Sequence, residues 1–198
     1  MAGVPKLREN IAKKIDVMYG TAINPETEIS ITAGATQAIY TVISAFIRPS
    51  DEVILIEPAY DSYRPSVEVN GGIAIAYNLT APDYKIDWSE MQKLVTDKTK
   101  MIIVNTPHNP TGTTLKASDM QELNKLTEGT DILVLSDEVY EHLVYDGAEH
   151  PSVLRYPNLF KRSLATYSFG KTLHATGWKL GYVVAPENLM VELSLIHI

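Results

Sequence analysis

The chain has 198 residues, of which 45% are hydrophobic, and a formal net charge of −7 from 24 acidic and 17 basic side chains. No stretch concentrates lysine and arginine, so nucleic-acid binding is not expected, and the absence of cysteine excludes disulfides, thiolate metal sites and a cysteine nucleophile. The start of the chain lacks the pattern of a secretory signal, and the apolar stretch 31–47 is shorter than the roughly 20 residues that a membrane helix needs. We therefore expect a cytoplasmic protein with one large domain and no membrane partner.

The first predicted element is a helix. Apolar residues from Leu7 to Met18 recur at helical spacing, Pro5 stands where a first helical turn tolerates proline, and Gly20 stands where the helix would end. Short β-branched runs bounded by turn residues follow along the chain, and they predict strands at 29–32, 53–56, 73–77, 101–105, 132–136, 164–167 and 182–185.

Segments of helix length separate most of these runs. Two of them begin with pairs of capping-box form, Asp87 with Glu90 and Ser118 with Gln121. Apolar strands that alternate with helices predict an α/β fold, with a seven-stranded, mostly parallel sheet and helices on both faces. In such sheets the ligand lies beyond the carboxyl ends of the strands, so the residues after each strand are the candidates for a site.

Small residues follow the first predicted strand, where positions 32–38 read TAGATQA. A helix that starts here would present free backbone N–H groups and its positive dipole end, which favours a phosphate ligand. The same string is also typical of an ordinary tight turn into a helix, and it is a weak signal when taken alone.

Two more polar strings follow buried strands. Residues 105–112 read NTPHNPTG, in which two X-Pro steps favour extended backbone and present Asn109 at the ligand edge. Residues 136–140 read SDEVY, which places the Asp137 carboxylate at a strand end and the Tyr140 phenol three residues later. An Asp in this position is also a common helix cap.

The sixth strand ends in SFGKT at 168–172, and ATGWKLGY follows at 175–182. A serine and two lysines, Ser168, Lys171 and Lys179, would therefore converge on the same edge of the sheet. Lys171 lies between a buried strand and a segment rich in glycine and aromatic residues, where its amine would be partly desolvated. Such a lysine is a candidate nucleophile.

Taken in order, these strings resemble those of class I and II aminotransferases, which are fold-type I pyridoxal-phosphate enzymes. The resemblance runs over nearly the whole chain, from about residue 3 to 192. Residues 57–63, which read EPAYDSY, together with 105–110 and 174–179, are similar to the branch that contains methionine, glutamine-phenylpyruvate and kynurenine aminotransferases. The resemblance implies transfer of an amino group from methionine or another bulky neutral or aromatic L-amino acid to a 2-oxo acid, by a homodimer.

The resemblance also implies a role for each candidate residue. Lys171 would hold the cofactor covalently and then move the proton at the substrate Cα, while Asp137 would pair with the pyridine nitrogen. Asn109 and Tyr140 would donate hydrogen bonds to the phenolic oxygen of the cofactor. The phosphate would be bound by the N–H groups of Ala35 and Thr36, the Ser168 hydroxyl and the Lys179 amine, and Tyr60 would stack on the pyridine ring.

Compared with that family, we expect residues 1–192 to form the cofactor-binding large domain, incomplete at both ends, and 193–198 to be an atypical tail. The small C-terminal domain is expected to be absent. With it goes the arginine that grips the substrate carboxylate, because no arginine follows Arg162.

Other functions fit the sequence less well. No GxGxxG follows a strand, and the five histidines show no metal-ligand spacing, so neither a dinucleotide site nor a metal site is expected. Three alternatives within the same fold stay open: a carbon-sulfur lyase, an inactive cofactor-binding fragment, and a sensor domain.

Overall fold

The computed structural model describes residues 2–196. The strands are β1 (Ile29–Thr32), β2 (Glu52–Glu57), β3 (Ile73–Asn78), β4 (Thr99–Asn105), β5 (Leu133–Asp137), β6 (Ser163–Ser168) and β7 (Gly181–Val184). The helices are α1 (Pro5–Tyr19), α2 (Ala35–Phe46), α3 (Tyr63–Val69), α4 (Trp88–Gln92), α5 (Ala117–Thr127), α6 (Pro157–Phe160), α7 (Phe169–Thr172) and α8 (Glu187–Ile196), with 3-10 turns η1 (Val153–Arg155) and η2 (Thr176–Trp178).

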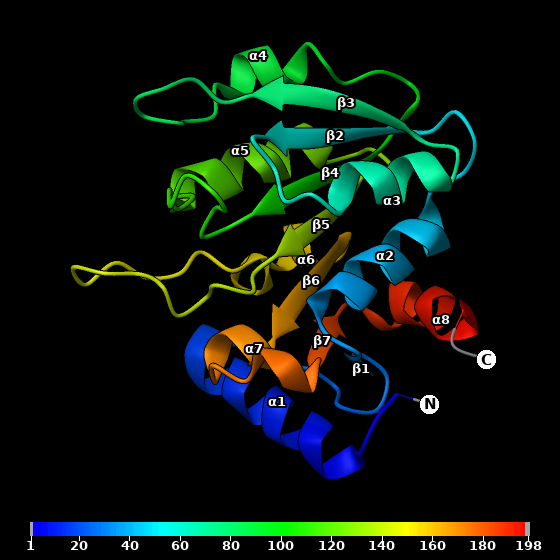
Figure 1. The fold of residues 1–198 in the computed structure, drawn as a ribbon, viewed down its shortest axis with the longest axis vertical. Coiled ribbons are helices and arrows are strands. Elements are labelled where there is room, and N and C mark those ends of the chain that lie inside the picture. Colours follow the sequence, from blue (N-terminus) through cyan, green and yellow to red (C-terminus); the bar gives the residue numbers. More distant parts are fainter. Residues whose placement is uncertain (1, 197–198) are drawn as a thin grey trace.

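The strands form one sheet in the order β1-β7-β6-β5-β4-β2-β3 (Figure 1). The pairs β2–β3, β2–β4, β4–β5 and β5–β6 are parallel, whereas β7 runs antiparallel to both of its neighbours. The predicted α/β class and the seven-stranded, mostly parallel sheet are confirmed. Since β1 and β6 both oppose β7, the carboxyl ends of β1 and of the parallel strands lie at the same edge.

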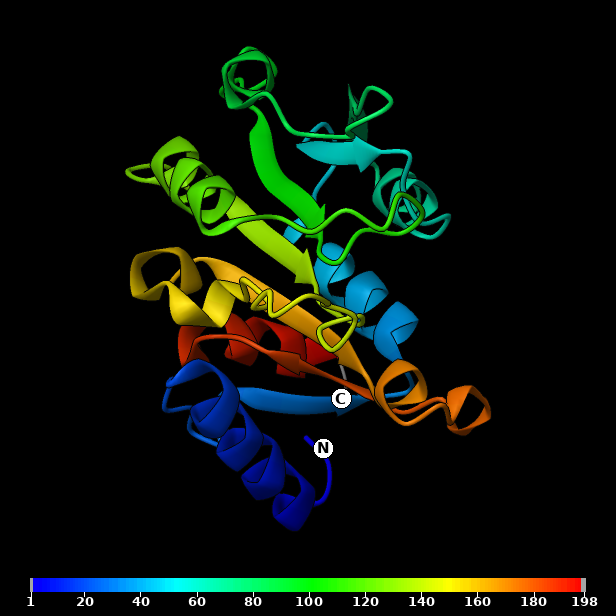
Figure 2. The ribbon, with the colours of Figure 1, turned by 90° about the vertical axis from the view of Figure 1, so that its left-hand side faces the viewer.

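Helices cover both faces of the sheet, as the sequence predicts (Figures 1 and 2). On one face α1, α4, α5 and α6 contribute to a core that includes Ile15, Met91, Leu123 and Leu159. On the other face α2, α3 and α8 contribute to a second core that includes Val42, Val67 and Leu193. None of the helices within residues 2–196 combines the length and the apolar character needed to cross a membrane.

Two of the predicted helix boundaries are confirmed and one is wrong. Gly20 ends α1 in the left-handed conformation, with φ 68°, and the Asp87 side chain caps α4 by accepting from two backbone N–H groups. Helix α5 begins at Ala117 rather than after Ser118. The Asp119 carboxylate accepts from the Lys116 backbone N–H at 2.7 Å, so this acid, and not the predicted serine, stabilises the start of the helix.

Helix α8 continues through position 193, where the sequence analysis placed the start of a tail. Leu193 is fully buried in the core between α8 and the sheet. Positions 197 and 198 of the predicted tail lie outside the described residues.

Candidate functional site

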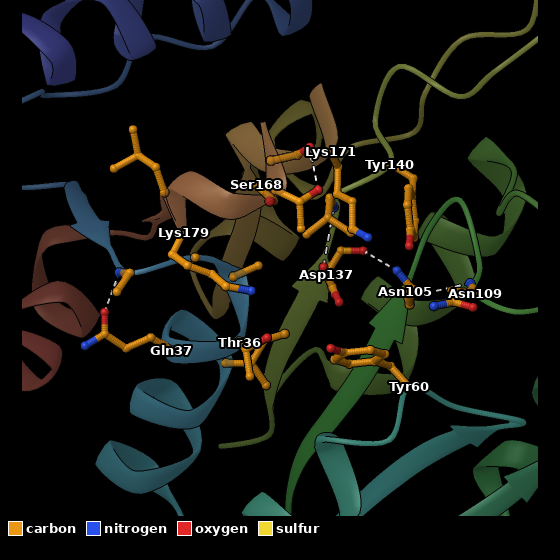
Figure 3. Close-up of a pocket in the computed structure, with 18 of the residues that line it drawn as sticks. Thr36, Gln37, Tyr60, Asn105, Asn109, Asp137, Tyr140, Ser168, Lys171 and Lys179 are labelled. Atoms are coloured by element: carbon orange, nitrogen blue, oxygen red, sulfur yellow. Dashed lines mark hydrogen bonds between the residues drawn. The ribbon is translucent and has the colours of Figure 1, made fainter. Parts of the chain in front are cut away.

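A cavity of about 480 Å³ opens at the carboxyl ends of the strands (Figure 3). Its lining includes all of the residues predicted for the site: Ala35, Thr36, Tyr60, Asn109, Asp137, Tyr140, Ser168, Lys171 and Lys179. They come from segments that are far apart in sequence and that the common direction of β1, β2, β4, β5 and β6 brings to one edge. The structure therefore assembles the whole predicted set around one space, which is large enough for a small-molecule ligand.

The turn between β1 and α2 forms one wall of the cavity. Gly34 precedes the helix with φ 83°, a conformation that side-chain-bearing residues rarely adopt. The first N–H groups of a helix have no partner within it, so those of Ala35 and Thr36 are available to an anion. The two preceding N–H groups are already bonded, that of Gly34 to the Thr32 carbonyl at 2.9 Å and that of Ala33 to the Gln37 side chain at 2.5 Å.

The start of β7 packs directly against this turn. A Cβ atom built on Gly181 would lie 2.7 Å from the Gly34 carbonyl carbon and 2.8 Å from the Ala35 nitrogen, closer than real contacts allow. Gly181 is therefore required for the close approach of the two segments. Lys179 lies just before β7, and its amine points toward Thr36 (Figure 3). The segment before β7 thus brings a cation to the helix N-terminus.

Lys171 lies in α7, directly after β6, and its amine is 5.5 Å from the centre of the Tyr140 ring. Figure 3 shows the Lys171 side chain directed toward Asp137 across the cavity. Lys171 as a residue is exposed, and the partial desolvation expected for its amine stays a prediction. Helix α7 is only four residues long and lies beyond the end of β6, and the residues that follow Lys171, 172–174, are exposed as well.

Asp137 is the last residue of β5 and is 4% exposed. Its carboxylate accepts a hydrogen bond of 2.5 Å from the Tyr63 hydroxyl. Burial raises the pKa of Asp137 to about 6, although the hydrogen bond from Tyr63 acts in the opposite direction. No helix begins directly after β5, since the next helical element is η1 at Val153, so Asp137 does not have the capping role that the sequence also allowed.

Asn105 is a site residue that the sequence analysis missed. It lines the cavity, is 7% exposed and ends β4. Its amide donates to the Asp137 backbone carbonyl at 2.8 Å, and its side-chain oxygen accepts from the Asn109 backbone N–H at 2.7 Å. Asn105 therefore fixes the loop that carries Asn109 relative to β5. The signal in the sequence was its place at the end of a strand, which is shared by Asp137.

Tyr63 was also missed. Its ring meets that of Tyr60 edge-on, with centroids 5.8 Å apart and an interplanar angle of 69°. Tyr60 is 38% exposed and lines the cavity beyond the end of β2, so a flat face is available to a ligand there. The position of Tyr63 three residues after Tyr60 in EPAYDSY was the only sequence signal.

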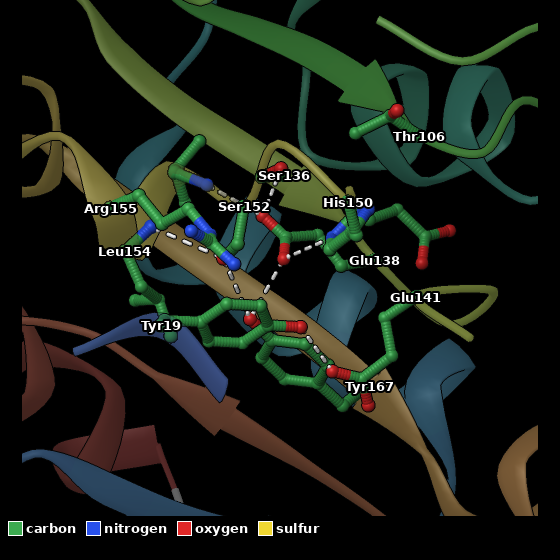
Figure 4. Close-up of polar contacts among 12 residues, drawn as sticks. Tyr19, Thr106, Ser136, Glu138, Glu141, His150, Ser152, Leu154, Arg155 and Tyr167 are labelled. Carbon is green, nitrogen blue, oxygen red and sulfur yellow. Dashed lines mark hydrogen bonds and ion pairs between the residues drawn. The ribbon is translucent and has the colours of Figure 1, made fainter. Parts of the chain in front are cut away.

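Behind the cavity, a buried polar cluster holds the chain on either side of Tyr140 (Figure 4). Glu138 is fully buried and accepts from the Tyr167 hydroxyl at 2.8 Å and the Val153 N–H at 3.0 Å, and it pairs with His150 Nε2 at 2.9 Å. Although burial acts to raise it, the pairing with His150 and the hydrogen bond from the Val153 N–H hold the pKa of Glu138 below its ordinary value.

The second acid of this cluster is Glu141, which is 2% exposed. It accepts from the Tyr19 hydroxyl at 2.5 Å and from the Lys14 amine, and both of these hydrogen-bond donors come from α1. Tyr140 therefore lies between two anchored acids. Among residues 2–196 there is no group of three acidic or histidine side chains arranged to hold a metal ion.

Comparison with known proteins agrees with this geometry. The family model for aminotransferase class I and II matches residues 1–197. Methionine aminotransferase of Escherichia coli is 44% identical over the whole chain, and kynurenine-oxoglutarate transaminase 1 of Rattus norvegicus is 35% identical over 98% of it. The chain spans only 51% and 49% of the lengths of these two relatives.

Solved structures give the same result. The crystal structure of YbdL from Escherichia coli, identified as a methionine aminotransferase, superposes with a TM-score of 0.97 over 99% of this chain and 52% of that one, at 44% identity. N-succinyldiaminopimelate aminotransferase from Mycobacterium tuberculosis superposes with a TM-score of 0.94 over 97% of this chain and 50% of that one, at 34% identity. The chain therefore belongs to the class I and II aminotransferases, with the fold-type I large-domain architecture.

Proposed function

We propose that the protein containing this chain transfers the amino group of an L-amino acid to a 2-oxo acid, with pyridoxal phosphate as cofactor. The observation that carries the proposal is the cavity at the strand ends, which brings an amine, a buried carboxylate and a helix N-terminus together. Class I and II aminotransferases are pyridoxal-phosphate dependent. Identity of 44% to the methionine aminotransferase of Escherichia coli supports methionine, or another bulky neutral or aromatic amino acid, as the donor.

The residues around the cavity fit this cofactor in size and in chemistry. Free N–H groups at the start of α2, with Ser168 and Lys179 beside them, suit a phosphate. The exposed face of Tyr60 suits a flat ring, and the acid Asp137 suits a protonated ring nitrogen. When bound, pyridoxal phosphate supplies an aldehyde carbon and a ring that accepts electrons from the substrate Cα.

In this proposal the residues of the chain bind, orient and move protons. Lys171 would hold the cofactor through its amine, and the same amine would move the proton at the substrate Cα. Asp137 keeps the ring nitrogen protonated through its negative charge. Asn109 and Tyr140 donate hydrogen bonds to the phenolic oxygen, and Tyr140 also lies against the Lys171 amine, 5.5 Å from its ring centre.

We propose further that two copies of the full-length protein associate and that the carboxylate of the substrate is held by a part of the protein beyond this chain. The support is the coverage of relatives: the chain spans 51% of the Escherichia coli methionine aminotransferase. In the sequence of this chain no arginine follows Arg162. A bidentate guanidinium is the group that best holds a carboxylate in one orientation.

Borohydride trapping tests the cofactor site. The full-length protein is incubated with pyridoxal phosphate, reduced and digested, and mass spectrometry locates the modified lysine. We expect the adduct on Lys171, and we expect none in Lys171→Ala, with Lys161→Ala as the matched control on an exposed lysine. An adduct on Lys179 would contradict the assignment.

Product analysis tests the reaction. With methionine and a 2-oxo acid, the proposal requires the 2-oxo acid of methionine and the new amino acid in equal amounts. Release of a thiol, ammonia and a shortened 2-oxo acid would identify a carbon-sulfur lyase instead. Stable cofactor binding with neither outcome would identify a sensor or an inactive protein.

A further inference from the structure

The Tyr63 hydroxyl makes the shortest hydrogen bond to the Asp137 side chain. Tyr63 is the first residue of α3, is 3% exposed and lines the same cavity as Asp137. Its oxygen lies 2.5 Å from Asp137 Oδ2. The other two donors, the Val139 N–H and the Thr166 hydroxyl, both lie 3.4 Å from Oδ1, near the outer limit of a hydrogen bond. Tyr63 therefore sets the orientation of the carboxylate.

The proton of this bond belongs to the phenol. Burial, together with the nearby Asp137 charge, raises the pKa of Tyr63 well above its ordinary value of 10.0, so Tyr63 stays a donor at any physiological pH. A donor fixed on one carboxylate oxygen favours the ionised form of the acid. This effect opposes burial, which raises the pKa of Asp137.

Tyr63 also supports the flat face of the site. Its backbone N–H donates to the Tyr60 carbonyl at 3.2 Å, and the two rings pack edge to face. One turn of chain therefore sets the position of the Tyr60 ring relative to the Asp137 carboxylate. This turn would therefore fix the position of a ligand stacked on Tyr60 relative to the Asp137 carboxylate.

We propose that Tyr63 is a positioning residue for the cofactor: it holds Asp137 ionised and aimed at the pyridine nitrogen, and it aligns Tyr60 beneath the ring. The inference rests on the proposed function, because it assigns Tyr63 a part in binding the same cofactor. It goes beyond the predicted site residues, which did not include Tyr63. The phenol hydroxyl acts through Asp137 and the ring acts through Tyr60. Tyr63→Phe removes the hydroxyl and keeps the ring, so it separates the two contributions.

The test compares two ligands that differ at one atom. Pyridoxal phosphate and its deaza analogue, in which CH replaces the ring nitrogen, are titrated into full-length protein across pH 5 to 9, followed by absorbance and by quenching of protein fluorescence. The ratio of the two dissociation constants measures the interaction of Asp137 with the nitrogen. Asp137→Asn sets the ratio that remains without the charge.

We expect the wild type to prefer pyridoxal phosphate and Tyr63→Phe to lose on the order of tenfold of that preference, since a shift of one pH unit in a pKa corresponds to tenfold. This loss of preference for pyridoxal phosphate should be largest near neutral pH, close to the Asp137 pKa of about 6. Tyr167→Phe is the matched control, because Tyr167 is a buried phenol bonded at 2.8 Å to Glu138, the neighbouring acid, and not to Asp137. It should keep the wild-type ratio.

The outcomes separate the inference from the function on which it rests. Wild-type protein that forms no lysine adduct with pyridoxal phosphate would remove the proposed function, and this inference with it. A wild type that distinguishes the two ligands, beside a Tyr63→Phe variant with the same ratio, would overturn the role of Tyr63 alone. Equal weakening of both ligands in Tyr63→Phe would also overturn it, since that pattern is expected of a residue that only supports the fold.

Discussion

At the scale of single residues, Asp137 illustrates how a binding site can lower the stability of the protein that carries it. Burial raises its pKa from 3.8 to about 6, which means that the folded protein holds this proton more tightly than the unfolded chain does. Protonation of Asp137 therefore stabilises the fold fully below about pH 4, and this contribution is lost as the pH rises to about 6. A pKa shift of about two units corresponds to roughly 3 kcal/mol in the free energy of unfolding.

Asp137→Asn should remove this pH dependence. We expect the cofactor-free variant to be more stable than the wild type above pH 6, by up to roughly 3 kcal/mol, and about equally stable near pH 4. Urea unfolding at several pH values between 4 and 7 measures the difference. If the free energies of unfolding of the two proteins change with pH in parallel, the charge on Asp137 does not destabilise the fold.

The residues of the site differ in how well the sequence predicts them. Lys171, Asp137 and Asn109 lie at or within about four residues of strand ends in distinctive strings, so their convergence was predictable from strand direction. Tyr63 was not, because its partner Asp137 lies 74 residues further along the chain and no local pattern connects them. The degree to which the Lys171 amine is desolvated depends on what packs around it in three dimensions, which the local sequence does not encode.

At the scale of elements, the fit between β7 and the turn before α2 depends on the missing side chain of Gly181. Gly181→Ala would place a Cβ atom 2.7 Å from the Tyr167 carbonyl oxygen and from the Gly34 carbonyl carbon. Because all of these atoms belong to the backbone, the strands must separate. We expect a loss of about 2 kcal/mol in unfolding free energy and weaker binding of phosphate-bearing ligands.

Gly177→Ala is the control for that experiment, since a Cβ on Gly177 meets no atom within 4 Å. Chemical denaturation and a titration with pyridoxal phosphate provide the two measurements. Equal behaviour of the two alanine variants would show that the contact between β7 and the turn is not tight in solution.

The buried cluster around Glu138 ties the end of β5 to β6 and to the segment before η1. Glu138→Gln keeps the shape but removes the charge that His150 faces at 2.9 Å. We expect a loss of about 3 kcal/mol in the unfolding free energy, because a buried group that loses its partner is costly. Glu149→Gln, on an exposed acid paired with Arg155, should change it by less than about 1 kcal/mol, as measured by urea unfolding.

The elements themselves were predictable to different degrees. Each predicted strand is present, because apolar β-branched runs between turn residues are a strong local signal. The start of α5 was misplaced because Ser118 and Asp119 are both capping residues and only the three-dimensional structure shows which one bonds. The antiparallel direction of β7 could not be predicted from its residues, since periodicity does not encode direction.

At the scale of the whole molecule, the 198-residue chain carries the cofactor cavity but spans 51% of the Escherichia coli methionine aminotransferase. Large apolar side chains are exposed, among them Trp178 at 81% and Leu173 at 66%, both close in sequence to Lys171. Exposed apolar area costs about 25 cal/mol per Å² and promotes association.

We therefore expect the chain, when expressed alone, to fold poorly, to bind pyridoxal phosphate weakly and to show no transamination above background. A version extended by the natural flanking sequence should transfer the amino group of methionine. Both proteins are assayed side by side with the same 2-oxo acids. Comparable turnover in the short form would show that substrate binding needs no residue outside it.

The position of β1 in the sheet has a consequence for protein synthesis. The neighbour of β1 is β7, and Ile29 pairs with Val184. The ribosome makes β1 early, but β1 cannot pair until β7 has been made much later. The turn that follows β1, which we propose binds the phosphate, reaches its place only when β7 arrives, together with Lys171 and Lys179. Ribosome-bound chains halted before residue 181 should therefore fail to retain pyridoxal phosphate, whereas chains halted well beyond α8 should retain it. Capture of the cofactor could therefore not precede the pairing of β7, and the cofactor could not guide the earlier steps of folding.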